Sequence, residues 1–251
     1  MLVPLIILLA AEVTSGAQGS QVTVPGKKVV KVDILQPAPD SERISSTLRA
    51  TVGELSDGNK FISISGQGTE KNNSPPLLYR ITIDLRQNTY KITRLKISDL
   101  PGGLFLRNSI LAIAPGTYYA SVALATQDLP QITLAYTNNY LSWRVNSNGS
   151  VSYVADRNDC WAANPSPLGT HWYISSCYEN LWNDGRLNHF VNANYYNHDF
   201  GLKNLATYVW HTSTIRGRND GWFEYHWNYN HWGEFSWLLD IDVYINGYKI
   251  R

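Results

Sequence analysis

The segment from Trp222 to Trp237 is the part of the sequence best suited to binding chemistry, because aromatic rings alternate there with acids, amides and histidines. In an extended strand, alternate side chains point to opposite faces. Aromatic rings stack on the apolar C–H faces of sugars, while carboxylates and amides bond sugar hydroxyls. The pattern predicts a surface for a glycan or another surface polymer, with ligand-binding residues Trp222, Glu224, His226, Asn228, Trp232, Asp240 and Asp242.

The two aspartates belong to a second expected strand, Phe235 to Ile245, in which apolar and polar positions alternate. We expect a turn over Tyr229 to Gly233 to pair the two strands as a hairpin. Side chains on the same face of the two strands then form one continuous surface. The competing interpretation is that aromatic side chains in all-β proteins simply fill cores and cover sheets. In this hairpin the core face gathers Phe223, Tyr225, Trp227, Phe235 and Trp237, and the outer face gathers Trp222, Glu224, His226, Asp240 and Asp242.

The carboxylates leave a glycoside hydrolase open as an alternative. Asp240 and Asp242 lie about 6.6 Å apart if both are in one strand, and glycoside hydrolysis needs two carboxylates about 5 to 9.5 Å apart, one of them protonated. Glu224 or Glu234 could supply the acid, and His226 could take part. Acids two residues apart are, however, ordinary on a solvated strand face. We therefore expect no catalytic residues, and an enzyme is the third hypothesis.

Metal binding is a further alternative with little support from spacing. His226 and His231 fall on opposite faces of a continuous strand, and no His-Glu-x-x-His motif occurs. A calcium site could use Asp220, Asp240 or Asp242, but the sequence lacks the aspartate-rich calcium loop. We expect structural histidines, no metal and no cofactor.

The N-terminus and the cysteines both indicate export. Leu2 to Ala11 is an apolar run of signal-peptide length, followed by small residues that predict cleavage after Ala17. No positive charge precedes the run, so a buried N-terminal element is the alternative. The only two cysteines, Cys160 and Cys177, enclose a loop rich in proline and are expected to form a disulfide in an oxidising compartment. We expect a secreted, extracellular protein with a signal peptide at residues 1–17.

The amino-acid composition differs between the N-terminal and C-terminal parts of the rest of the chain. All nine Trp and all six His follow residue 142, and the charged fraction of 16% is well below the usual ~25%. A net charge of +1 argues against a dedicated nucleic-acid binder, and no long apolar run predicts a transmembrane anchor. The turn cluster at residues 100–103 separates an N-terminal β-rich region, residues 22–100, from an aromatic-rich domain, residues 104–251, that holds the disulfide.

Strand patterns dominate both regions. Leu78 to Leu85 alternates and is expected to pair with Tyr90 to Ile97. Further hairpins are indicated at Asn148-Gly149 and at residues 218–221. Ser41 to Leu55 is the only segment that could be helical. The spacing of turns predicts an all-β, antiparallel sandwich-like fold, with two β-rich units.

Three functions fit these patterns. The first is a secreted, non-catalytic recognition module that binds carbohydrate through exposed aromatics. The second is a self-assembling subunit of a surface layer, appendage or coat, whose aromatics lie in interfaces, where Tyr and Trp are enriched. The third is the secreted hydrolase.

Overall fold

The described part of the chain is built of strands and one short turn of helix. The computed structural model describes residues 27–44, 47–96, 115–129, 131–167, 169–199, 206–233 and 235–250. None of these residues forms a helix with the length and apolar character needed to cross a membrane. The elements are β1 (Val29–Ile34), β2 (Gln36–Pro37), β3 (Thr47–Leu55), β4 (Lys60–Lys71), β5 (Leu77–Asp84), β6 (Thr89–Arg94), β7 (Gly116–Gln127), β8 (Thr133–Val145), β9 (Val151–Ala162), β10 (Trp172–Asn183), β11 (Leu187–Asn197), β12 (Thr207–Gly217), β13 (Trp222–Gly233), η2 (Ser236–Leu238) and β14 (Asp240–Ile250).

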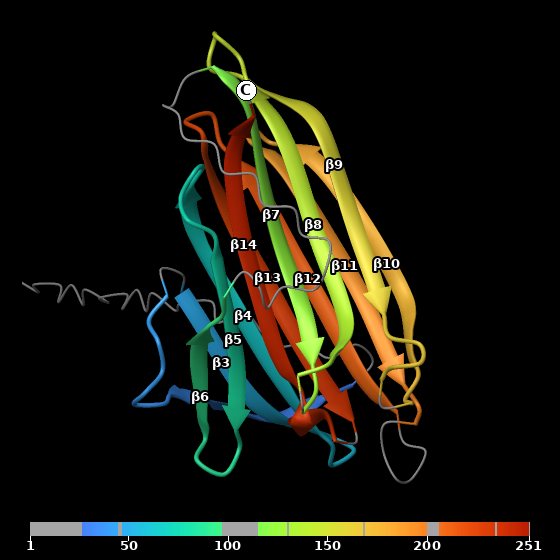
Figure 1. Ribbon diagram of the computed structural model, residues 1–251. Helices are drawn as coiled ribbons and strands as arrows, with labels where there is room; N and C mark the ends of the chain where they lie inside the picture. The colour runs from blue at the N-terminus through green and yellow to red at the C-terminus, as the bar shows by residue number, and fades with distance from the viewer. Residues whose placement is uncertain are drawn as a thin grey trace, which may run out of the picture.

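The strands form two seven-stranded sheets packed face to face (Figure 1). One sheet, which we call the aromatic sheet, has the order β1-β3-β4-β13-β12-β11-β10. The other, which we call the second sheet, has the order β2-β6-β5-β14-β7-β8-β9. Strand pairs are antiparallel apart from β2 with β6, which are parallel. The all-β, antiparallel sandwich predicted from the sequence is confirmed.

The short-range hairpins follow from local turn chemistry. β5 pairs with β6, and β8 pairs with β9 across Asn148-Gly149, where the glycine adopts a φ of 78° that other residues rarely take. β12 pairs with β13 across residues 218–221. These three pairings were expected from the sequence, and each brings strands together that are neighbours in the chain.

The core lies between the two inner faces and is rich in aromatic rings. Trp143, Trp172 and Trp227 are its largest fully buried side chains. Room for the indole of Trp227 comes from Gly66 on the neighbouring β4, where a Cβ atom would lie 2.4 Å from the ring. Truncating such a ring typically costs about 3–5 kcal/mol of stability, so these tryptophans belong to the scaffold.

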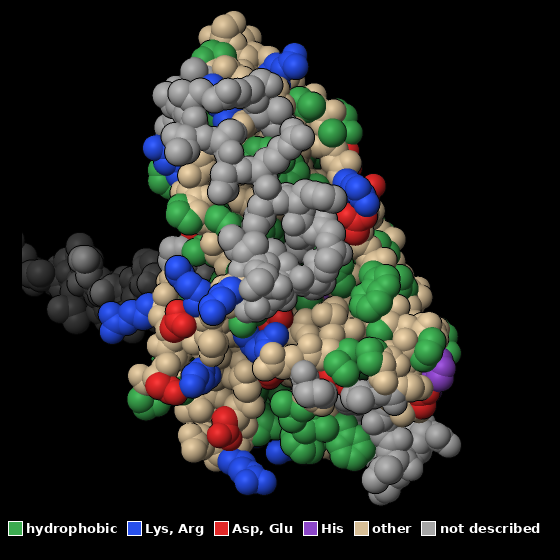
Figure 2. Space-filling view, viewed as in Figure 1, with side chains coloured by type: hydrophobic (Ala, Val, Ile, Leu, Met, Phe, Trp, Pro, Cys, Tyr) green, Lys and Arg blue, Asp and Glu red, His purple; other side chains and the backbone are tan. Residues whose placement is uncertain are grey.

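The outward face of the second sheet carries interspersed charges. Figure 2 shows Lys and Arg side chains beside Asp and Glu side chains over the β5–β6 region. Ion pairs join Lys91 to Asp40 and Arg94 to Glu42 there. Such exposed pairs contribute little to stability, about 0–1 kcal/mol each.

The possible helix over Ser41 to Leu55 is absent, and the expectation is wrong for the residues described. Residues 47–55 form β3, which pairs with β1 and β4. Thr51 and Val52 are β-branched and buried in this sheet, where their restricted side chains pack well.

The hairpin expected between Trp222–Gly233 and the next strand is also wrong. β13 lies between β12 and β4, whereas β14 lies in the second sheet between β5 and β7. The chain crosses between the sheets at η2, and Phe235 before it has a left-handed φ of 55°. Trp237, expected in the core, is consequently 53% exposed on this crossing.

The N-terminal and C-terminal parts of the chain share both sheets. β4 pairs with β13 in the aromatic sheet, and β5 pairs with β14 in the second sheet. One hydrophobic cluster contains buried residues from both parts, among them Ile62, Ile81 and Trp227. The expected boundary at residues 100–103 and the expected signal peptide at residues 1–17 lie outside the described residues. That the two parts fold as separate units stays a prediction.

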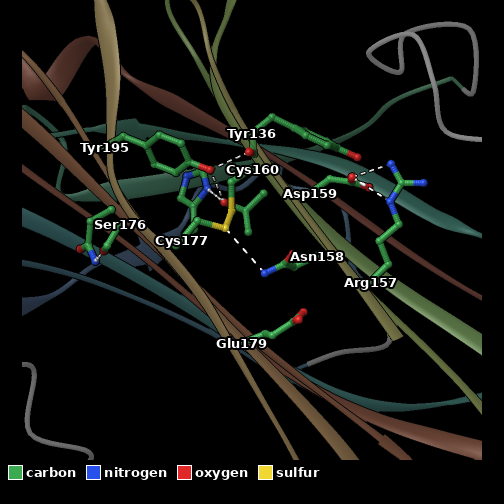
Figure 3. The surroundings of a disulfide bond; sticks show 12 residues. Tyr136, Arg157, Asn158, Asp159, Cys160, Ser176, Cys177, Glu179 and Tyr195 are labelled. Atoms are coloured by element: carbon green, nitrogen blue, oxygen red, sulfur yellow. Dashed lines mark hydrogen bonds and ion pairs between the residues drawn. A yellow bond between two sulfur atoms is a disulfide. The ribbon is translucent and has the colours of Figure 1, made fainter. Parts of the chain in front are cut away.

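The predicted disulfide is present. Cys160 of β9 and Cys177 of β10 are bonded, with their Cα atoms 6.4 Å apart. β9 and β10 are the last strands of the two different sheets, so the bond joins the sheets at one open edge of the sandwich (Figure 3).

Candidate functional site

The candidate site lies on the outward face of the aromatic sheet. Strand alternation places Trp222, Glu224, His226 and Asn228 on this face, while Phe223, Tyr225 and Trp227 are buried between the sheets. Trp232 joins the same face near the end of β13. The two-faced pattern predicted for this strand is therefore confirmed, and five of the seven predicted binding residues share one surface.

Asp240 and Asp242 do not join them, because β14 belongs to the second sheet. Asp242 is buried and accepts hydrogen bonds from Arg80 Nε at 2.6 Å and Nη2 at 2.8 Å. Asp240 accepts a hydrogen bond from Thr82 at 3.1 Å, and burial raises its pKa to about 6. These carboxylates are thus separated from Glu224 and His226 by the thickness of the sandwich.

This separation removes the version of the hydrolase alternative that uses Glu224 as the acid. That version needs Asp240 or Asp242 beside Glu224, and the two sheets keep them apart. Both oxygens of Asp242 are engaged by Arg80, which argues against its use in the calcium site considered as an alternative. Asp220 is held by Arg218 at the turn before β13. The other acid considered, Glu234, lies outside the described residues.

A depression of about 620 Å³ is hollowed in the face of the aromatic sheet. Trp182 on β10 lines it at one side, and it is 37% exposed. Polar residues, among them three threonines, and one glycine make up most of the remaining lining. Two predicted residues, Glu224 and His226, contribute to it, and desolvation by the surrounding protein lowers the pKa of His226. The lining residues are Thr47, Gln67, Gly68, Thr69, Trp182, Thr214, Arg216, Glu224, Tyr225 and His226.

Glu224 is held by three arginines at the rim of this depression. Arg186 Nη1 lies 2.9 Å from one carboxylate oxygen and 3.1 Å from the other. Arg216 and Arg218 each approach to 3.4 Å. With its oxygens engaged in this way, Glu224 organises the guanidinium groups, which are themselves planar, multiple donors suited to hydroxyl or carboxylate groups of a ligand.

A belt of aromatic residues crosses the other end of the same face, and of its residues only Trp232 was predicted from the sequence. Tyr173, Tyr196, Tyr208 and Trp232 occupy paired positions on four adjacent strands, β10 to β13. The rings of Tyr173 and Tyr196 stack with centroids 5.3 Å apart, as do those of Tyr208 and Trp232. We call these four residues the aromatic belt.

Amides occupy the face between the depression and the aromatic belt. Asn192 accepts a hydrogen bond from the Trp210 indole, and Asn228 donates to Thr212 at 3.3 Å. Asn194 donates to Ser176 at 2.8 Å. Asn192, Asn194 and Tyr196 alternate along β11 with buried residues and lie on this face.

The histidines are divided between surface and core. His226 is exposed on the candidate face, whereas His231 on the same strand is fully buried, as the strand alternation predicts. His211 is also buried, and its two ring nitrogens lie 2.9 Å from the hydroxyls of Thr126 and Thr137. Burial lowers the pKa of both His211 and His231 to about 3, so both rings are neutral in the folded protein near neutral pH.

Comparison with known proteins adds no relative to this description. No family model, no curated protein and no solved structure matches the chain.

Proposed function

We propose that the protein is a secreted recognition module that binds a glycan on the outward face of the aromatic sheet. The observation that carries the proposal is the joining, on one sheet face, of a polar depression beside exposed Trp182 with a belt of four aromatic residues. The disulfide between Cys160 and Cys177 supports a site of action outside the cell, because disulfides form and persist in oxidising compartments.

The chemistry of this face suits a neutral, hydroxyl-rich polymer. Trp182 and Tyr178 are two exposed aromatics on one side of β10, 37% and 51% exposed. Gln67 and Thr214 line the same depression as Trp182, and Asn228 lies on the same sheet face, where their amides and hydroxyl can donate to and accept from sugar hydroxyls. The arginines around Glu224 add donors that also suit an acidic sugar.

The length of the face suits a polymer more than a single sugar. Adjacent strands lie about 4.8 Å apart, so the aromatic belt spans about 14 Å across four strands. The depression lies toward the other end of these strands, with lining residues from β10, β12 and β13 and from the neighbouring β3 and β4. A chain of several sugars can contact both regions at once, and each added contact slows dissociation.

The test is tryptophan fluorescence of the oxidised protein, titrated with soluble neutral and acidic polysaccharides. We expect a saturable change with at least one polysaccharide. Replacing Trp182 with alanine should weaken the affinity at least tenfold, which is about 1.4 kcal/mol, because stacking on its indole is lost. Trp182 lies at the sheet edge, so this substitution should leave the unfolding midpoint nearly unchanged.

The matched control is Trp161→Ala. Trp161 is 49% exposed on β9, also a strand at the edge of its sheet, but it belongs to the second sheet. It should leave the affinity within about twofold. Equal losses in both variants, or no response to any polysaccharide, would contradict a glycan site on the aromatic sheet.

A self-assembling subunit is the second candidate, and the strand β1 favours it. Val30, Val32 and Ile34 are exposed, and β1 lies at the edge of the aromatic sheet with β3 as its one paired strand. An apolar edge strand is a template for pairing with another chain. If fluorescence shifts to the blue with rising protein concentration while no glycan has an effect, assembly replaces recognition as the function.

A further inference from the structure

A second group of chemically capable side chains lies at the open edge of the sandwich, away from the candidate glycan face. Asp156 of β9, Glu179 of β10 and His189 of β11 each direct one ligand atom to the same point, and these atoms lie within 4.8 Å of one another. His189 is fully buried, whereas Glu179 is exposed. Figure 3 shows Glu179 on β10 beyond the disulfide that joins the two sheets.

The protonation pattern of the His189 ring follows from its neighbour Asn139. The Asn139 amide nitrogen donates to the backbone carbonyls of His189 and Ser213, both at 3.1 Å, which fixes the orientation of the amide. Its carbonyl oxygen lies 2.8 Å from His189 Nδ1. A carbonyl oxygen only accepts, so Nδ1 carries the hydrogen. In the neutral ring, Nε2 therefore presents a lone pair.

That lone pair faces two carboxylates. Nε2 lies 3.2 Å from Glu179 Oε2 and 3.4 Å from Asp156 Oδ2. The lone pair of Nε2 and the two carboxylate oxygens repel one another at these distances. A proton or a metal ion bound among them removes the repulsion. A protonated ring would hold a carboxylate at about 2.7–2.9 Å, the usual length of a charge-assisted N–H···O bond.

The two separations from His189 Nε2, 3.2 Å to Glu179 and 3.4 Å to Asp156, are compatible with a metal ion bound among the three atoms. A tetrahedral Zn²⁺ ion with bonds of about 2.0–2.2 Å sets its ligand atoms about 3.3–3.6 Å apart. The ring is oriented by Asn139 and Asp156 is oriented by Tyr153, whose hydroxyl donates to Oδ1 at 2.5 Å. Metal sites characteristically carry such outer partners, which fix the ligands in place.

We propose that Asp156, Glu179 and His189 bind one divalent transition-metal ion, of which Zn²⁺ is the best fit. One imidazole nitrogen and two carboxylate oxygens suit Zn²⁺ and its neighbours in the first transition row, whereas Mg²⁺ and Ca²⁺ prefer oxygen ligands alone. Three protein ligands leave the fourth position for water, which can enter on the side of exposed Glu179. The ion joins β9 of the second sheet to β10 and β11 of the aromatic sheet.

The proposal is independent of the glycan function and is tested with the metal alone. Full-length oxidised protein is freed of metal with a chelator and titrated with Zn²⁺ by calorimetry, with 5 mM Mg²⁺ present. We expect one Zn²⁺ per chain and an increase in the thermal unfolding midpoint. Co²⁺ in place of Zn²⁺ should give the visible absorption of a four-coordinate site.

Three variants locate the ion. Glu179→Gln changes an exposed side chain and Asp156→Asn changes a second ligand, and each should weaken Zn²⁺ affinity at least tenfold and abolish the thermal shift. The matched control is Asp159→Asn, which alters an acid on the same strand that pairs with Arg157 instead. It should keep the affinity within twofold.

Two results would overturn the proposal. If the wild-type protein binds no Zn²⁺, the three side chains form no ion site and the proposal is wrong. If Zn²⁺ binds equally well to wild-type protein and to both ligand variants, the ion lies elsewhere on the chain.

Discussion

His211 and His231 are buried in the core, and their burial makes the stability of the whole protein depend on pH. Both rings are fully buried, and burial lowers the pKa of each to about 3. In the unfolded chain a histidine titrates near pH 6.5. The unfolded chain therefore binds more protons than the folded protein between these pH values, and stability must fall as the pH falls through this range.

We predict that the free energy of unfolding decreases from pH 7 to pH 5 by about 2 kcal/mol for each of these histidines. Asp240 opposes the trend, because burial raises its pKa to about 6 and its ionisation therefore favours the unfolded chain. Urea unfolding at pH 7, 6 and 5 measures the balance. Asp240→Asn should steepen the decrease and His211→Gln should make it shallower, and an unfolding midpoint that is the same at pH 7 and pH 5 would contradict the assignment.

At the scale of strands, the sequence was informative where partners are neighbours in the chain. The β8–β9 and β12–β13 hairpins are set by Asn148-Gly149 and by the turn at residues 218–221, and both were predicted. The alternation in β13 also predicted which of its side chains are buried. Local turn chemistry and the two-residue period of a strand carry this information.

The sequence was uninformative where partners are distant. Trp227 pairs with Gly66, and neither alternation nor turn residues reveal a contact across that separation. Alternation is equally satisfied on either sheet, so it could not place Asp240 and Asp242 in the second sheet. Tyr173, Tyr196 and Tyr208 come from three strands, and only their register brings them together as the aromatic belt.

The disulfide also acts between strands. It joins β9 and β10, which lie in different sheets and are not paired by backbone hydrogen bonds. Cys160 and Cys177 are 17 residues apart, and a loop of that size is stabilised by about 3 kcal/mol on the chain-entropy estimate. We predict that the double variant Cys160→Ser, Cys177→Ser loses about 2–4 kcal/mol in urea unfolding. Reducing the wild-type protein should reproduce this loss and should have no effect on the double variant; an unchanged midpoint in both would show that the edge is held by other contacts.

At the scale of the whole molecule, the boundary at residues 100–103 was drawn from a change in amino-acid composition. The strands on its two sides nevertheless pair with each other in both sheets. Removing residues 1–103 would take away β4 from beside β13 and β5 from beside β14. It would also expose inner-face residues such as Trp227 and Ile241, which belong to one shared core cluster. Exposed apolar surface and unpaired strand edges both favour aggregation.

We therefore predict that a fragment of residues 104–251 aggregates or lacks a cooperative urea transition, in contrast to the full chain. Near-ultraviolet circular dichroism of the fragment checks whether the tryptophans are packed. A sigmoidal transition with a native-like spectrum would instead establish the aromatic-rich part as a domain that folds alone.

The position of β14 constrains when folding can finish. β14, which comes last in sequence among the described strands, lies inside the second sheet between β5 and β7. A chain that leaves the ribosome or crosses a membrane N-terminus first presents β5 and β7 long before the residues that separate them arrive. The sandwich can close only after the eleven residues of β14 have emerged, so the order of synthesis delays the native pairing of β5 and β7 with β14 until that strand has been made.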